Sequence, residues 1–143
     1  MSTPSGSELN DSFDWDLLVK SRLNAILCGN LVTVDRTLTS LRDHLQLPLH
    51  EWSFRGGSPL PSFHTGTLIV NDVAGTTLEE QHTFLAWLDA HHAVRVITLS
   101  EIPLYDLVRN GVMLEHLYYR LNPIYCPLDR SCISDNLGRT SAA

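Results

Sequence analysis

Residues 66–73 read Gly-Thr-Leu-Ile-Val-Asn-Asp-Val, and this short run sets the expected fold class. A Gly-Thr turn leads into apolar and β-branched residues, and Asn71 and Asp72 close the run. The pattern predicts a short strand buried on both faces, which is typical of parallel sheets. Ligands of open α/β sheets bind at the carboxyl ends of the strands, so Asn71 and Asp72 are candidate site residues.

Strands and helices are expected to alternate along the rest of the chain. Short apolar or alternating runs predict further strands over residues 24–28, 49–54, 93–99 and 123–126. Apolar residues at spacings of three and four predict helices over residues 15–23, 31–47, 104–110 and 112–121. Gly and Pro content indicates a loop over residues 55–61.

A further helix is expected directly after the 66–73 run. Thr76 or Thr77 can cap it, because a hydroxyl can accept a hydrogen bond from the first free backbone N–H groups. Glu79 and Glu80 then fall in the first turn, where the helix dipole favours acids. The side chains expected to face the core are Leu78, Phe84, Leu85 and Leu88.

This alternation predicts one α/β domain over residues 15–128, with a parallel sheet covered by helices on both faces. Residues 1–14 are rich in Ser, Gly and acids, and we expect them to be disordered. Residues 129–143 are polar and small, which indicates a flexible C-terminal tail.

The charge balance limits the expected partners. The formal net charge is −6, and Lys20 is the single lysine. Binding to nucleic acid or to an anionic membrane needs a basic face, so we expect neither. No apolar run approaches the length of about 18 residues that a membrane span requires. The N-terminus also lacks the basic and apolar regions of a secretory signal.

The three cysteines are odd in number and lack CxxC spacing. Cys28 lies in an apolar run and is expected to be a buried free thiol. Cys126 and Cys132 are close in sequence and could form only a local loop. This usage favours a reduced cytoplasmic protein.

Three motifs after residue 65 resemble the ATPase domain of one family. They are GTLIVNDV at 66–73, RVITLSE at 95–101 and LVRNGVMLEHLYYRLN at 107–122. They are similar to the GTLFLDEI, RVIAATN and LVxxGxFRxDLYYRLN motifs of sigma-54-dependent transcription activators. The match needs no gap over 95–122, and the resemblance extends over about residues 22–128. It implies a three-layer, P-loop NTPase-like (AAA+) sheet.

The resemblance places a phosphate loop after the first strand, where the family needs GxxxxGK(S/T). Glycines let backbone N–H groups cradle the phosphates, and the lysine neutralises them. In this chain Val34 stands at the second glycine and Asp35 at the lysine. The carried-over phosphate-loop positions are Gly29, Asn30, Thr33, Asp35 and Arg36.

The remaining ATPase positions are also changed. Asn71 and Asp72 stand where the family has the Asp that helps to hold Mg²⁺ and the Glu that orients water. Glu101 replaces a polar sensor Asn. Of the two arginines that act across the ring, one aligns with Leu114 and the other with Arg120. Because small displacements of catalytic groups are expensive, these positions are expected to be vestigial.

The expected function follows from these departures. Residues 55–65 contain nothing similar to the GAFTGA loop that contacts sigma-54, and no helical lid is expected after Leu128. We therefore expect a degenerate domain without ATP hydrolysis, cofactor or bound metal, acting as a regulatory or protein-interaction module. Its partner would be an AAA+ activator or a second copy of the chain. The alternative is a residual ATP-binding protein or weak ATPase that uses Mg-ATP.

Overall fold

The computed structural model describes residues 15–132, in which five parallel strands form one sheet. The spatial order is β2-β3-β4-β1-β5. The strands are β1 Ala25–Cys28, β2 Leu49–Ser53, β3 Gly66–Asn71, β4 Val94–Ser100 and β5 Ile124–Pro127. The predicted α/β class and parallel sheet are confirmed. The expected disorder of residues 1–14 lies outside the described residues, as does most of the expected tail.

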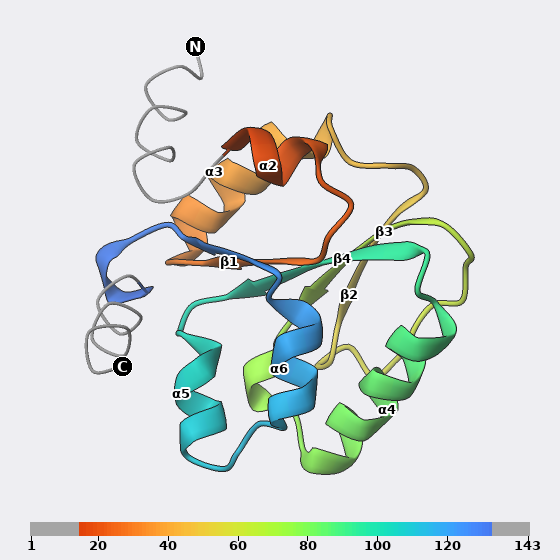
Figure 1. Ribbon diagram of the computed structural model, residues 1–143, viewed down its shortest axis with the longest axis vertical. Helices are drawn as coiled ribbons and strands as arrows, with labels where there is room; N and C mark the ends of the chain where they lie inside the picture. The colour runs from red at the N-terminus through yellow and green to blue at the C-terminus, as the bar shows by residue number, and fades with distance from the viewer. Residues whose placement is uncertain (1–14, 133–143) are drawn as a thin grey trace.

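Helices cover both faces of the sheet (Figure 1). They are α2 Trp15–Lys20, α3 Leu31–Arg42, α4 Leu78–Ala90, α5 Leu104–Arg109 and α6 Glu115–Leu121, with a 3₁₀ turn η1 at Val73–Gly75. α2 and α3 pack on one face, and α4, α5 and α6 pack on the other. Within the described residues the helices and strands follow the predicted order.

β3 lies inside the sheet, between β2 and β4, and every residue from Gly66 to Val70 is buried. Because side chains alternate along a strand, Leu68 and Val70 pack toward α4 and α6, while Ile69 packs toward α3. Ile69 stands opposite Ile97 of β4 in the parallel register. The 66–73 run therefore contributes to both hydrophobic cores, as its unbroken apolar pattern predicted.

The start of α4 confirms one prediction and corrects another. Thr77 caps the helix and Glu80 completes a capping box with it. Leu78, expected in the core, keeps 50% of its surface exposed. Gln81 is buried instead, since its amide donates to the Val112 carbonyl at 2.9 Å and accepts from the Leu114 N–H at 2.7 Å. The polar residue Gln81 is therefore part of the core, where the apolar pattern had placed Leu78.

Cys28 is buried as predicted, but the prediction that it is a free thiol is wrong. Cys28, at the end of β1, forms a disulfide with Cys132, with a Cα–Cα distance of 6.0 Å. The free thiol is Cys126, whose burial raises its pKa to about 12. Residues 129–132, expected in the tail, fold back so that Cys132 is fully buried. The pairing arises because β5 lies beside β1, an adjacency that local spacing cannot reveal.

Thiol counting tests this pairing. In protein purified without reductant, we expect no reactive thiol in the native state, because Cys126 is buried and protonated. One thiol should react in denaturant, and three should react in denaturant after reduction. Three reactive thiols in denaturant without reduction would contradict the disulfide.

Gly66 allows a second test, of the strand itself. Its φ is +118°, and a Cβ there would lie 2.3 Å from the Pro48 carbonyl oxygen. Gly66→Ala should therefore lower the free energy of unfolding by at least about 1–3 kcal/mol, measured by urea denaturation. Gly75→Ala is the matched control, since a Cβ at Gly75 meets nothing within 4 Å. Equal denaturation midpoints for the two variants would refute the conformation assigned to Gly66.

Candidate functional site

A pocket of about 360 Å³ lies at the carboxyl edge of the sheet, between the first turn of α3 and η1. Neighbouring strands β1 and β4 continue into helices on opposite faces, α3 and α5, which is where open α/β sheets bind ligands. Five of the residues that the sequence singled out line this pocket, namely Gly29, Asp35, Asn71, Asp72 and Glu101. Arg55, which the sequence did not single out, lines it as well.

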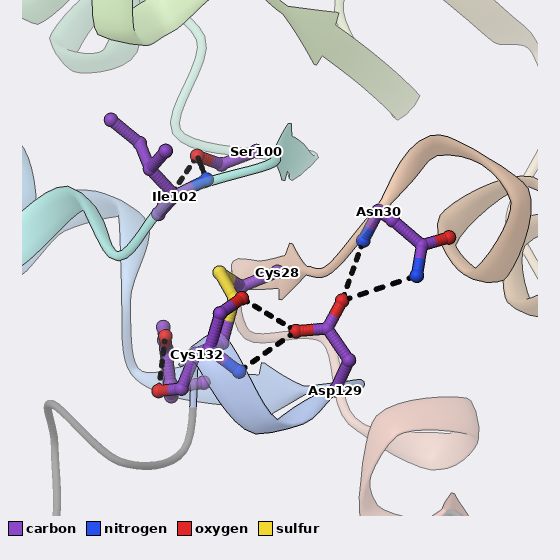
Figure 2. The surroundings of a disulfide bond; sticks show 8 residues. Cys28, Asn30, Ser100, Ile102, Asp129 and Cys132 are labelled. Atoms are coloured by element: carbon purple, nitrogen blue, oxygen red, sulfur yellow. Dashed lines mark hydrogen bonds between the residues drawn. A yellow bond between two sulfur atoms is a disulfide. The ribbon is translucent and has the colours of Figure 1, made fainter.

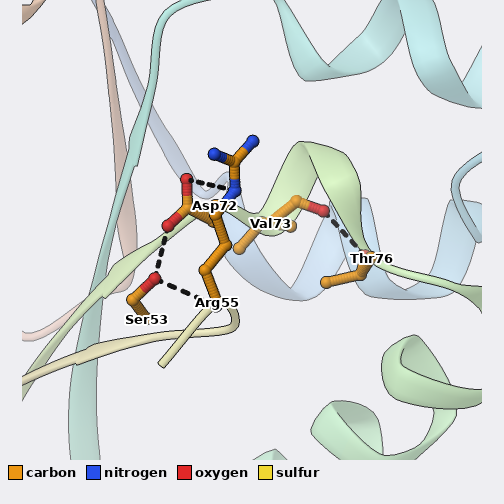
Figure 3. A network of polar contacts seen from close by, with 5 residues as sticks. All are labelled: Ser53, Arg55, Asp72, Val73 and Thr76. Atoms are coloured by element: carbon orange, nitrogen blue, oxygen red, sulfur yellow. Dashed lines mark hydrogen bonds and ion pairs between the residues drawn. The ribbon is translucent and has the colours of Figure 1, made fainter. Parts of the chain in front are cut away.

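Asp72 is held by its own chain. Its backbone is left-handed, with φ of 68°. The Ser53 hydroxyl at the end of β2 donates to one carboxylate oxygen, and Arg55 Nε lies 3.6 Å from the other (Figure 3). The Ser53 hydroxyl also accepts from the Arg55 N–H at 3.1 Å. These contacts occupy the carboxylate that the family comparison places at the water-orienting position.

The pocket is acidic. Asp35, Asp72 and Glu101 contribute three carboxylates to its lining, and Arg55 contributes the one guanidinium among the lining residues. The Arg55 side chain is 82% exposed, so water screens its pairing with Asp72. Across residues 15–132, no group of three or more His, Cys, Asp or Glu could hold a metal ion.

The connection from β1 to α3 is short. β1 ends at Cys28 and α3 begins at Leu31, so only Gly29 and Asn30 lie between them. The Asn30 side chain accepts from the Thr33 N–H at 2.9 Å, and its carbonyl accepts from the Val34 N–H at 2.9 Å. Backbone N–H groups that would cradle phosphates in such a loop therefore serve the first turn of a helix.

Asp129 closes the same turn from the C-terminal side (Figure 2). Its carboxylate accepts from the Asn30 N–H at 2.7 Å and from the Ser131 hydroxyl at 2.7 Å. The Ser131 hydroxyl first, and the backbone N–H groups of Asn30 and Ser131 after it, hold the pKa of Asp129 below its usual value. Sequence reasoning missed this residue. The Asp-x-Ser spacing, which favours a local Asx turn, was the available signal.

The other predicted site residues lie elsewhere. Thr33 and Arg36 are on α3 but do not line the pocket, and Asn30 is used as the cap. Arg120, at the end of α6, lies near the amino edge of the sheet, where its Nη1 is 2.5 Å from the Asp89 carboxylate. Asp89 lies on α4, 31 residues from Arg120 in the sequence.

The strand order and the pocket at the carboxyl edge define an α/β fold of the AAA+, P-loop NTPase-like type. Solved structures of NtrX from Brucella abortus are similar to this chain. The complex with ATP superposes with a TM-score of 0.66 at 14% identity, covering 95% of this chain and 40% of that one. The complex with ADP gives 0.58 at 17%, covering 78% and 33%. A further NtrX structure gives 0.63 at 15%, covering 86% and 35%.

At these identities the likeness establishes the fold, and the chain spans 33–40% of the length of those structures. No family model matches the chain, and no curated protein matches it. Among residues 15–132, no helix has the length and apolar character that crossing a bilayer requires.

Proposed function

We propose that this chain is a non-hydrolysing regulatory or protein-interaction module, built on the AAA+ sheet of sigma-54-dependent activators. The two-residue connection between β1 and α3 carries the proposal. An ATPase of this class needs a loop of backbone N–H groups around the phosphates. Here the corresponding residues begin a helix, and Asp35 stands where the phosphate-binding lysine would be.

The charge of the pocket also supports a module that does not hydrolyse ATP. A triphosphate entering it would approach Asp35, Asp72 and Glu101. Two like charges about 4 Å apart repel by about 4 kcal/mol at an effective dielectric constant near 20. The contacts of Asp72 with Ser53 and Arg55 also remove it from a water-orienting role.

Exposed apolar residues at the pocket support an interaction role. Leu31 and Ile102 line the pocket and keep 64% and 44% of their surface exposed, and adjacent Val32 keeps 66%. Exposed apolar groups gathered at one place are typical of protein contacts. The proposed partner is an AAA+ transcription activator or a second copy of this chain, with no direct contact to nucleic acid or membrane.

The proposed location is the cytoplasm, where such activators act. Disulfides are uncommon in the cytoplasm, so the Cys28–Cys132 disulfide is the observation that counts against this location. The thiol count described above therefore bears on the location as well as on the fold.

The second candidate function is residual nucleotide binding. The observation in its favour is that the first turn of α3 lines the pocket, since helix N-termini attract phosphate groups. Calorimetric titration with Mg-ATP separates the two functions. We expect no saturable binding up to millimolar nucleotide, and none after Asp35→Asn with Glu101→Gln, because removing charge does not restore a loop. Saturable, magnesium-dependent binding that Asp72→Asn weakens would favour the second function.

The interaction role has its own test, in which light scattering measures self-association and co-elution measures binding to the AAA+ domain of a host activator. Leu31→Asp should weaken the complex at least about tenfold by placing a carboxylate in the contact. Leu78→Asp is the matched control, since both leucines are exposed first residues of a helix. A monomer that binds no activator, or equal losses in both variants, would defeat the proposal.

A further inference from the structure

A second pocket, of about 340 Å³, lies at the opposite, amino edge of the sheet. Asn24, directly before β1, and Arg95, the second residue of β4, contribute to its wall. Arg120 comes from the last turn of α6, and Arg22 comes from the segment between α2 and β1. The pocket is therefore separate from the acidic one, with the length of the strands between them.

The charge of this second pocket is the reverse of the first. Arg22, Arg95 and Arg120 contribute three guanidinium groups, and no carboxylate is among its lining residues. His91 and His92, at the end of α4, add ring nitrogens. In a chain with a formal net charge of −6, this is a local concentration of positive charge.

Arg95 is the unusual member. It keeps only 8% of its surface exposed, and its Nε donates to the Leu23 carbonyl at 2.6 Å. Its buried Nη2 has no hydrogen-bond partner within residues 15–132. Burial lowers the pKa of the guanidinium below its ordinary value, and Cys126 acts in the opposite direction. A buried, charged donor without an acceptor is costly, so a ligand that supplies an acceptor would be favoured.

The other two arginines differ in how their charge is met. Arg22 donates to the side-chain carbonyl of Gln46, a neutral group. Arg120 pairs with Asp89, whose side chain is 70% exposed and lies outside the lining. One ion pair, at an exposed carboxylate outside the lining, thus offsets one of the three guanidinium charges. Planar guanidinium forks suit the oxygens of phosphate and carboxylate groups.

We propose that this pocket binds a small oxyanion, a phosphate or carboxylate group, with Arg95 as the buried donor and Arg22 and Arg120 at the rim. The site is formed within one chain and does not depend on the function proposed for the acidic pocket. Arginine side chains bind the oxygens of phosphate and carboxylate groups alike, so the relative affinities of the two anions identify which group the pocket takes.

The test is an NMR titration of the full chain with inorganic phosphate and, separately, with acetate, at constant ionic strength. We expect saturable shifts confined to the amides around residues 22–24 and 91–96. Arg22→Gln should raise the phosphate dissociation constant about tenfold, the loss of one charge-assisted contact. Arg109→Gln removes the same charge from α5, away from the pocket, and should leave the constant unchanged.

Saturation by either anion supports the site, with tighter phosphate binding assigning a phosphate group and tighter acetate binding a carboxylate. Linear shifts without saturation, or equal weakening in Arg22→Gln and Arg109→Gln, would overturn the proposal. Arg22 is exposed, so its replacement should leave the fold intact, which the unchanged remainder of the spectrum verifies.

Discussion

The passage from β1 into α3 through Gly29 and Asn30 constrains the whole carboxyl edge of the sheet. Asn30 must cap the helix immediately, which commits the next residues to helical hydrogen bonds. A Cβ at Gly29 would lie 3.0 Å from the Leu128 side chain and 3.3 Å from the Asp129 carboxylate. The turn is therefore packed against the C-terminal segment on one side, while Gly29 and the first turn of α3 line the acidic pocket.

The C-terminal segment depends on the same turn. Asp129 accepts from the Asn30 N–H, and Leu128 N–H donates to the Cys28 carbonyl at 2.7 Å. The Cys28–Cys132 disulfide fastens the end of this segment. A carboxylate of the chain itself thus satisfies the backbone N–H of Asn30. The pocket at this edge is acidic, whereas the amino edge keeps an unpartnered guanidinium nitrogen among the described residues.

The fold could be predicted largely from local patterns. The unbroken run at 66–73 marked a buried strand, and the Thr77 and Glu80 pair marked the start of α4, because both signals act over a few residues. The disulfide could not be predicted, since Cys28 and Cys132 are 104 residues apart and meet only through the β1–β5 pairing. Gln81 became a core residue because Val112 and Leu114 satisfy its amide, which is a tertiary circumstance.

The candidate site, too, was predicted only in part from the sequence. The strand-end rule placed Asn71 and Asp72 at one pocket, and the family resemblance added Gly29, Asp35 and Glu101, which the structure also brings there. Arg55, which lines the pocket, and Asp129, which binds the Asn30 N–H, were not predicted. Both lie in loops whose course the sequence does not specify. The resemblance aligned Arg120 with an arginine that acts across a ring, as a vestigial position, and within this chain its guanidinium is paired with Asp89.

After β1 the chain enters α3 at Leu31, over the positions that the sequence resemblance aligns with a phosphate loop. Backbone ¹³Cα secondary shifts of residues 29–36 test it directly in solution. We expect helical shifts beginning at Leu31 and continuing through Asp35 without interruption. Non-helical shifts from Gly29 to Val34, with the helix beginning only at Asp35 or beyond, would mean that a loop of the usual length is present and would contradict it.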